Sequence, residues 1–137
     1  MALVRFGVSI DQELLERFDR LVVQRGYTNR SEAIRDLIRE RLVQEEWQRG
    51  EEVVGVIILV YDHHVREIEA KITDIQHELY SHVLASMHVH LDHDRCLEVV
   101  AVRGEGERIA ELAARLIGLR GVRHGRLTAT TTGRELR

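Results

Sequence analysis

The sequence predicts an α+β protein with two domains, a strand followed by two helices and then a βαββαβ unit. Three observations support this fold class. Apolar and polar residues alternate over residues 4–10, apolar residues recur every three or four positions over residues 11–42, and strand-like and helix-like segments follow one another over residues 53–130. Although the length of 137 residues fits a single domain, the change of pattern favours two.

The first domain begins with a predicted strand over residues 4–10. Its apolar side chains share one face and its other side chains share the second: Phe6, Val8 and Ile10 against Arg5, Gly7 and Ser9. Asp11 then caps a helix that Gly26 ends, and either Asn29 or Ser31 caps a second helix.

These elements, about 45 residues in all, are too few to enclose a core in one chain. The strand also lacks a partner within the domain. The simplest arrangement pairs it with the same strand of a second copy, which gives a two-stranded antiparallel ribbon over four helices. The sequence therefore predicts that the first domain is a dimer.

We place the first domain at residues 1–46, a polar linker at 47–52, the second domain at 53–131 and a loose tail at 132–137. The second domain alternates strands and helices: a strand at 53–61, a helix from Val65 to Leu79, strands at 82–91 and 96–103, a helix after Gly104 that includes Ile109 to Ile117, and a strand at 122–130. The order βαββαβ is that of a ferredoxin-like unit of the ACT type.

The composition of the chain argues against some classes of function. The net charge of −3 argues against a broad basic DNA-binding surface, so any binding of nucleic acid must depend on a few well-placed arginines. No apolar run approaches the ~20 residues of a membrane span, and the N-terminus lacks the apolar segment of a signal peptide. We therefore expect a cytoplasmic protein with no membrane partner, in which the single cysteine is a metal ligand or a nucleophile.

The segment from Met87 to Val99 gathers soft and borderline metal ligands. His88 and His90 point the same way because side chains alternate along a strand. If the polar cluster at 92–94 is a tight turn that pairs Leu91 with Arg95, then His90 lies opposite Cys96 and His88 lies opposite Glu98, with Cβ atoms roughly 5 Å apart.

Two imidazoles and a thiolate can then bind one metal ion. Glu98 is placed to accept a hydrogen bond from a ligand imidazole and so to fix its orientation. His82 lies too far along the strand, roughly 20 Å from His88 at 3.3 Å per residue, so another segment or subunit must supply a fourth ligand. From the sequence alone the remaining histidines are all candidates: His63, His64, His77, His93 and His124.

Three imidazoles and one thiolate suit zinc, copper or nickel, and affinity alone favours copper. Four donors held in a plane favour nickel(II) or copper(II) over tetrahedral zinc.

Three stretches of the first domain resemble ribbon-helix-helix DNA-binding proteins: Arg5-Phe6-Gly7-Val8-Ser9-Ile10, Gly26-Tyr27 and Asn29-Arg30-Ser31-Glu32-Ala33-Ile34-Arg35-Asp36. Together with the metal-binding stretch, the whole chain resembles the nickel-responsive transcriptional regulators, the NikR family. This resemblance implies one Ni²⁺ per subunit, a homotetramer built as a dimer of dimers, and His77 of a neighbouring subunit as the fourth ligand.

The resemblance also implies binding of double-stranded DNA at a palindromic operator. Arg5 and Ser9 can face the floor of the major groove, which admits a two-stranded ribbon. Position 7 is glycine where the family usually has a second hydroxyl residue, so one base-reading side chain is missing. At the start of the second helix, backbone N–H groups and the guanidinium can hold a phosphate: Asn29, Arg30 and Ser31.

Glu32 and Asp36 lie four residues apart on one helical face. The resemblance implies that they share a cation at the domain junction. An exposed pair of carboxylates facing Arg35 or Arg39 is the alternative interpretation.

We therefore expect a nickel-responsive repressor of nickel-uptake genes and not an enzyme, because four protein donors would leave no open coordination position for catalysis. One alternative is a ribbon-helix-helix repressor whose ACT-type domain senses an amino acid or another metal. Another is the antitoxin of a toxin pair.

Overall fold

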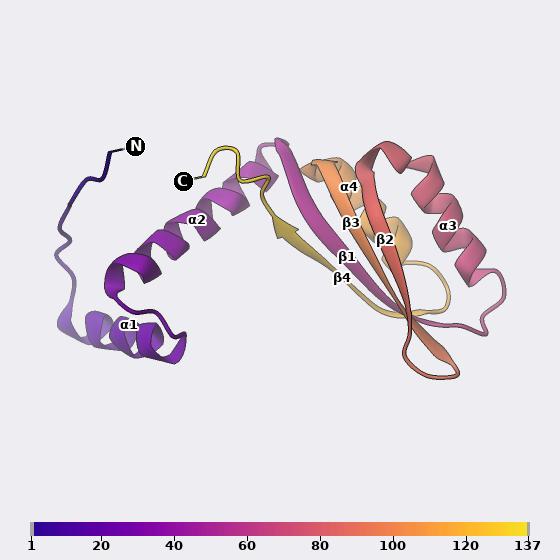
Figure 1. Ribbon diagram of the computed structural model, residues 1–137, viewed down its shortest axis with the longest axis horizontal. Coiled ribbons are helices and arrows are strands. Elements are labelled where there is room, and N and C mark those ends of the chain that lie inside the picture. Colours follow the sequence, from indigo (N-terminus) through magenta and orange to yellow (C-terminus); the bar gives the residue numbers. More distant parts are fainter. Residues whose placement is uncertain (1, 137) are drawn as a thin grey trace. The chain divides into compact units, whose positions relative to one another are not determined.

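The computed structural model describes residues 2–136, and the chain divides into two compact units at Glu40 and Arg41. Figure 1 shows a helical N-terminal part and a sheet with helices, which are described separately below. Within the described residues, no helix has both the length and the hydropathy that a bilayer crossing requires.

The first unit contains α1, Gln12–Gln24, and the beginning of α2, Arg30–Gln48. The strand predicted at 4–10, which was expected to pair with a second copy, is absent from the single chain, because residues 2–11 carry no strand. Figure 1 shows this segment as an irregular coil. Its apolar side chains stay in solvent, with Phe6 70% and Val8 69% exposed. A strand needs the backbone of another strand to satisfy its N–H and C=O groups, and the described part of the chain places none beside this segment.

Both predicted helix caps are present. Oδ1 of Asp11 accepts hydrogen bonds from the backbone N–H groups of Glu13 at 3.0 Å and Leu14 at 3.2 Å. Asn29, and not Ser31, caps α2, because its Oδ1 accepts from the backbone N–H of Glu32 at 2.9 Å.

Polar contacts join the two helices of the first unit. The guanidinium of Arg30 donates two hydrogen bonds of 2.8 Å to the carboxylate of Asp19 in α1. The hydroxyl of Tyr27 donates to Oδ2 of Asp36 at 2.6 Å. Only Val22 and Ala33 are buried among the described apolar residues of this unit.

The second unit confirms the predicted order βαββαβ. It comprises β1 (Glu52–Asp62), α3 (Ile68–Glu78), a short 3₁₀ turn η1 (Tyr80–His82), β2 (Val83–His90), β3 (Arg95–Glu105), α4 (Gly106–Ile117) and β4 (Val122–Thr130). The sheet is antiparallel in the order β2-β3-β1-β4, so β2 and β4 are its edges. Figure 1 shows α3 and α4 beside the sheet, and their buried side chains form one core with its inner face.

That core follows the strand alternation. Residues of β1 are alternately buried and half-buried, and the buried ones face the helices with every second residue of β3. The largest fully buried side chains are Tyr61, Ile57, Leu59, Ile68, Ile109, Leu112 and Leu116.

Two boundaries differ from the prediction. Helix α2 continues through Gln48, where the sequence suggested a linker, because Trp47 packs on the sheet and its indole N–H donates to the carbonyl of Thr130 at 2.7 Å. Helix α3 starts at Ile68 instead of Val65, since Glu67 has the left-handed φ of 65° that a regular helix does not accept.

Candidate metal centre

The hairpin of β2 and β3 has the predicted register. His90 pairs with Cys96, and His88 pairs with Glu98. The hairpin closes through a hydrogen bond of 3.0 Å from the N–H of Leu91 to the carbonyl of Arg95. Its turn is ordered by Asp92, whose Oδ1 accepts from the backbone N–H groups of Asp94 and Arg95 at 2.9 and 2.8 Å.

This register brings three soft or borderline donors together. Sγ of Cys96 lies 3.5 Å from Nδ1 of His90, and the ring centroids of His88 and His90 are 4.8 Å apart. One donor atom from each residue falls within 4.8 Å of the others. Cys96 is fully buried whereas both histidines are exposed, so the group opens outward from the edge strand β2.

Two further residues fix the ring of His88. Its Nδ1 lies 3.1 Å from Oε2 of Glu98 and 3.0 Å from the hydroxyl of Tyr61. With its proton on Nδ1, the ring donates to the buried carboxylate of Glu98, and Nε2 keeps its lone pair for a metal ion. The contact with Glu98 follows the sequence prediction.

Sequence reasoning missed Tyr61. It reaches the site because β1 pairs with β3 and sets Tyr61 directly opposite Cys96. In the sequence, the only indication that Tyr61 has a role at the site was its position as an aromatic residue at the end of an apolar strand. Pairing between strands far apart in the sequence was needed to place it.

The thiol of Cys96 is fully buried. Burial raises the pKa of Cys96 above its ordinary value, and the hydrogen bond with Tyr61 opposes this rise. Burial likewise raises the pKa of the Tyr61 hydroxyl. Cys96 would hold a metal ion here as a thiolate, so binding would have to release the thiol proton.

His63 approaches the same sulfur from the loop after β1. Its Nδ1 lies 3.9 Å from Sγ of Cys96 and 2.9 Å from Oε1 of Glu69. His63, Glu69 and Cys96 thus form a second group of donors that overlaps the first at Cys96.

The other candidate histidines lie elsewhere. His77 is exposed on α3 and, within residues 2–136, belongs to no group of converging donors. It borders a cavity of about 270 Å³ that Glu98 also lines. His82 lies in η1 and His124 on the edge strand β4. His64 and His93 meet each other with Asp94, apart from Cys96.

The residues predicted to contact DNA are not assembled in one chain. Arg5, Gly7 and Ser9 are exposed within the coil at residues 2–11. At the start of α2, Ser31 is exposed, while the guanidinium of Arg30 is held by Asp19.

Glu32 and Asp36 each bind neighbouring side chains. Oε2 of Glu32 accepts from the hydroxyl of Thr28 at 2.6 Å, and this hydrogen bond lowers the pKa of the carboxyl group. Asp36 accepts from Tyr27 and from Arg39, the latter at 3.3 Å. The pairing with Arg39 matches the alternative interpretation, and the shared cation site stays a prediction.

Comparison with known proteins covers both units. Residues 54–130 match the family described as NikR C terminal nickel binding domain. Residues 4–45 match the family described as Ribbon-helix-helix protein, copG family. A solved structure of an uncharacterized protein from Thermotoga maritima has a TM-score of 0.50 and 11% identity, and covers 60% of this chain and 99% of its own, which supports the fold alone.

Full-length relatives are named nickel-responsive regulators. One from Solibacter usitatus is 56% identical over 98% of each chain. One from Geobacter metallireducens is 54% identical over 97% of this chain and 96% of its own, and one from Pyrococcus furiosus is 52% identical over 99% of each. The match of both units, in this order and over nearly the whole length, places the chain in the NikR family of nickel-responsive transcriptional regulators.

Proposed function

We propose that the protein is a repressor that binds one Ni²⁺ per subunit through His88, His90 and Cys96, with His77 of the partner subunit as the fourth ligand. The observation that carries this proposal is the convergence of two imidazoles on a buried sulfur at a sheet edge. A set of three imidazoles and one thiolate suits nickel, and the family relationship selects nickel over copper and zinc.

A ligand from a second subunit is consistent with the exposure of the site. His88 and His90 lie on an edge strand, and His77 is exposed on α3 of the same unit. His77 does not reach Cys96 of its own chain. In a tetramer, His77 of the partner subunit can therefore complete each site.

Homotetramer formation has support in both units. The first unit leaves an apolar segment unpaired and buries two apolar side chains, so it needs a second copy. In the second unit, the face of the sheet opposite α3 and α4 carries half-buried apolar residues: Val56, Ile58, Leu97 and Val99. Such a face is typical of a self-association surface.

Pairing of two N-terminal segments would create the ribbon that reads DNA. Alternation sets Arg5, Gly7 and Ser9 on the face opposite Phe6 and Val8, so the first set can enter the major groove while the second covers the helices. Two ribbons in a dimer of dimers would bind the two half-sites of a palindromic operator.

Nickel would act by selecting among tetramer conformations. An ion bound by side chains of two subunits stabilises arrangements in which those subunits are close and ordered. If these arrangements also space the two ribbons for both half-sites, nickel raises DNA affinity by a shift of population. Genes for nickel uptake are the expected targets, because their repression closes a feedback loop.

Replacement of Cys96 by alanine tests the metal site. Nickel-loaded wild-type protein should absorb through sulfur-to-nickel charge transfer, and Cys96→Ala should lose that absorption and most of its nickel affinity. The exposed variant His124→Ala is the matched control and should keep both. Charge-transfer absorption that persists in Cys96→Ala would exclude the thiolate as a ligand.

Mixing of variants tests the contribution of the second subunit. Neither His77→Ala nor His88→Ala alone should form complete sites, whereas tetramers that contain both chains should regain a fraction of them. Calorimetry of metal-free protein against nickel and against amino acids separates this proposal from an amino-acid sensor.

A further inference from the structure

The end of α2 is held on the second unit by one apolar side chain. Trp47 packs against the core of that unit, and within the described residues no other apolar side chain of α2 does so. Its indole N–H donates to the carbonyl of Thr130, the last residue of β4, at 2.7 Å. Packing and a directional hydrogen bond therefore fix the same residue.

Two glycines let the end of the helix approach the second unit closely. A Cβ at Gly106, the first residue of α4, would lie 3.0 Å from the backbone oxygen of Trp47 and 3.3 Å from its Cε3. A Cβ at Gly55 in β1 would lie 3.4 Å from Cη2 of the indole. The anchor of α2 thus involves β1, α4 and β4.

The connection from this anchor to the sheet is short. Helix α2 ends at Gln48, and β1 begins at Glu52. Gly50 between them has the left-handed φ of 73°, and the backbone N–H of Glu51 donates to the carbonyl of Glu46 at 3.3 Å. The helix therefore closes in a tight turn directly after Trp47.

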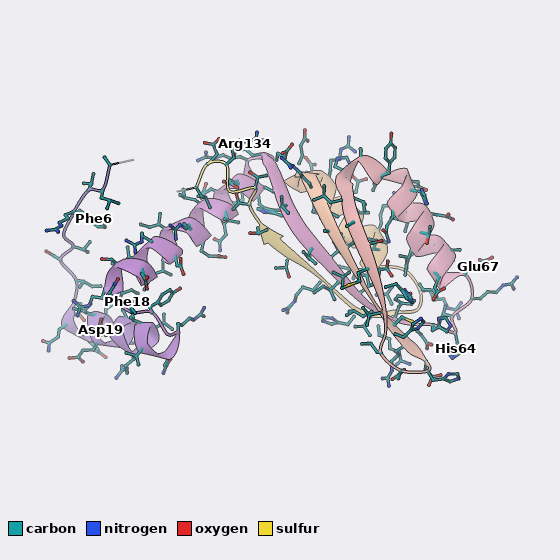
Figure 2. The ribbon with its side chains drawn as sticks, in the orientation of Figure 1. Phe6, Phe18, Asp19, His64, Glu67 and Arg134 are labelled. Carbon is teal, nitrogen blue, oxygen red and sulfur yellow. The ribbon has the colours of Figure 1, made fainter. Side chains whose placement is uncertain are left out.

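The C-terminal tail lies beside the same turns of α2. Residues of both segments border a cavity of about 390 Å³, among them Leu42, Glu46, Glu135 and Leu136. Figure 2 labels Arg134 in this tail, near the end of α2. Glu46 is only 8% exposed, so the second unit covers the last turns of the helix.

We propose that Trp47 is a positioning residue for DNA recognition. By holding the end of α2, it keeps short the chain that joins the first unit to the second, and it thereby limits the spacing of half-sites that the protein binds. This inference rests on the proposed binding of paired half-sites. It assigns selectivity for spacing to a residue outside the Cys96 group.

Release of the anchor would lengthen the connection. Without Trp47, α2 has no apolar contact with the core of the second unit, and a helix end without tertiary packing frays in water. Residues 41–48 span about 12 Å as a helix and up to about 26–29 Å when extended. The difference of roughly 15 Å corresponds to about four base pairs of DNA at about 3.4 Å each.

The expected effect is a change in effective concentration. Once one ribbon is bound, the second reaches its half-site most often when the connecting chain matches the span, and less often as that chain gains length. A loose connection therefore weakens binding at the preferred spacing and tolerates other spacings.

Operators with altered spacing test the proposal. DNA sites are selected from a random-sequence pool by nickel-loaded wild-type protein, and the half-sites are then moved by up to about four base pairs. Wild-type affinity should fall at least about tenfold over this series, because paired binding contributes roughly 10²–10⁴-fold. Trp47→Ala should bind the selected spacing at least about tenfold more weakly and vary less than about threefold over the series.

Two further variants separate positioning from folding. Trp47→Phe keeps an aromatic ring and loses the N–H donor, so it should restore most of the selectivity for spacing. Gln48→Ala changes the exposed neighbouring residue and should behave as wild type. All three variants should keep the sulfur-to-nickel absorption and the far-UV circular dichroism of the wild-type protein.

Paired insertions test the anchor with Trp47 in place. Two glycines inserted between Glu40 and Arg41 lie before the anchor and should relax the spacing as Trp47→Ala does. The same insertion between Gly50 and Glu51 lies after the anchor and should leave the selectivity unchanged, because Trp47 still holds α2.

Equal effects of the two insertions, or wild-type selectivity in Trp47→Ala, would overturn the proposal. If Trp47→Ala loses its nickel absorption and the insertion before the anchor keeps wild-type selectivity, Trp47 only maintains the fold, and the proposal is again overturned. A nickel-loaded wild-type protein with no preference for spacing would instead refute the binding of paired half-sites, so the two failures are distinguished.

Discussion

The two units differ in how much of their own structure one chain can complete. In the second unit β1 has a hydrogen-bonded neighbour on each side, and its inner face is covered by two helices. In the first unit, the segment at 4–10 pairs with no strand among the described residues 2–136, and Phe6 and Val8 remain exposed. A pattern of alternating residues therefore forms a strand only where a pairing backbone is available.

The largest effect is expected in the second unit, whose core is complete within one chain. Leu112 in α4 is fully buried, so Leu112→Ala should lower the free energy of unfolding of the second unit by about 2–5 kcal/mol, through lost burial and a residual cavity. The single tryptophan, Trp47, packs on this unit and reports its urea unfolding by fluorescence. A change below 1 kcal/mol would show that this core is looser than the structure indicates.

A smaller effect is expected in the unit that needs a partner. Leu37 in α2 is 54% exposed in the single chain. In the dimer of first units that we propose, it is expected to become buried. Leu37→Ala should cost about 1.5–3 kcal/mol per buried copy. Far-UV circular dichroism should show this loss as an unfolding transition of the helices that depends on protein concentration.

The Trp47 fluorescence transition is the internal control for that variant, since it should stay at the wild-type urea concentration. If Leu37→Ala leaves both transitions unchanged, the apolar face of α2 is not a dimer interface.

The smallest effect is the difference in unfolding free energy between alanine substitutions at two glycines, one in each unit. A Cβ at Gly125 in β4 would lie 2.5 Å from Cγ1 of Ile117, so Gly125→Ala should cost about 1–3 kcal/mol by overpacking. A Cβ at Gly7 would meet nothing within 4 Å. Gly7→Ala should therefore change stability by less than about 0.5 kcal/mol. Urea unfolding of both variants checks the difference, and equal effects would remove the contrast in packing between the units.

The sequence predicted those features that depend on neighbouring residues. Asp11 and Asn29 cap their helices through bonds to residues two or three positions away. His90 meets Cys96 because a short turn determines the register of a hairpin. Such contacts join residues that are a few positions apart in the sequence or that face each other across one hairpin turn.

Features that depend on distant segments were missed. Tyr61 reaches His88 because β1 lies beside β3, and His64 reaches Asp94 because two loops meet at one end of the sheet. Trp47 extends α2 to Gln48, into the start of the predicted linker, because the sheet offers it a packing surface and the carbonyl of Thr130.

By itself, the sequence determined the α+β class, the order of elements in the second unit and the group of His88, His90 and Cys96, since periodicity and a hairpin turn are local properties. Only the tertiary structure decided which side chains surround that group and that a second cluster of donors forms beside it. The physical reason is that contacts between strands and loops far apart in the sequence depend on how the whole sheet assembles. The N-terminal segment is consistent with the same principle, because residues 2–11 carry no strand in the single chain and we propose that a second copy supplies the pairing backbone.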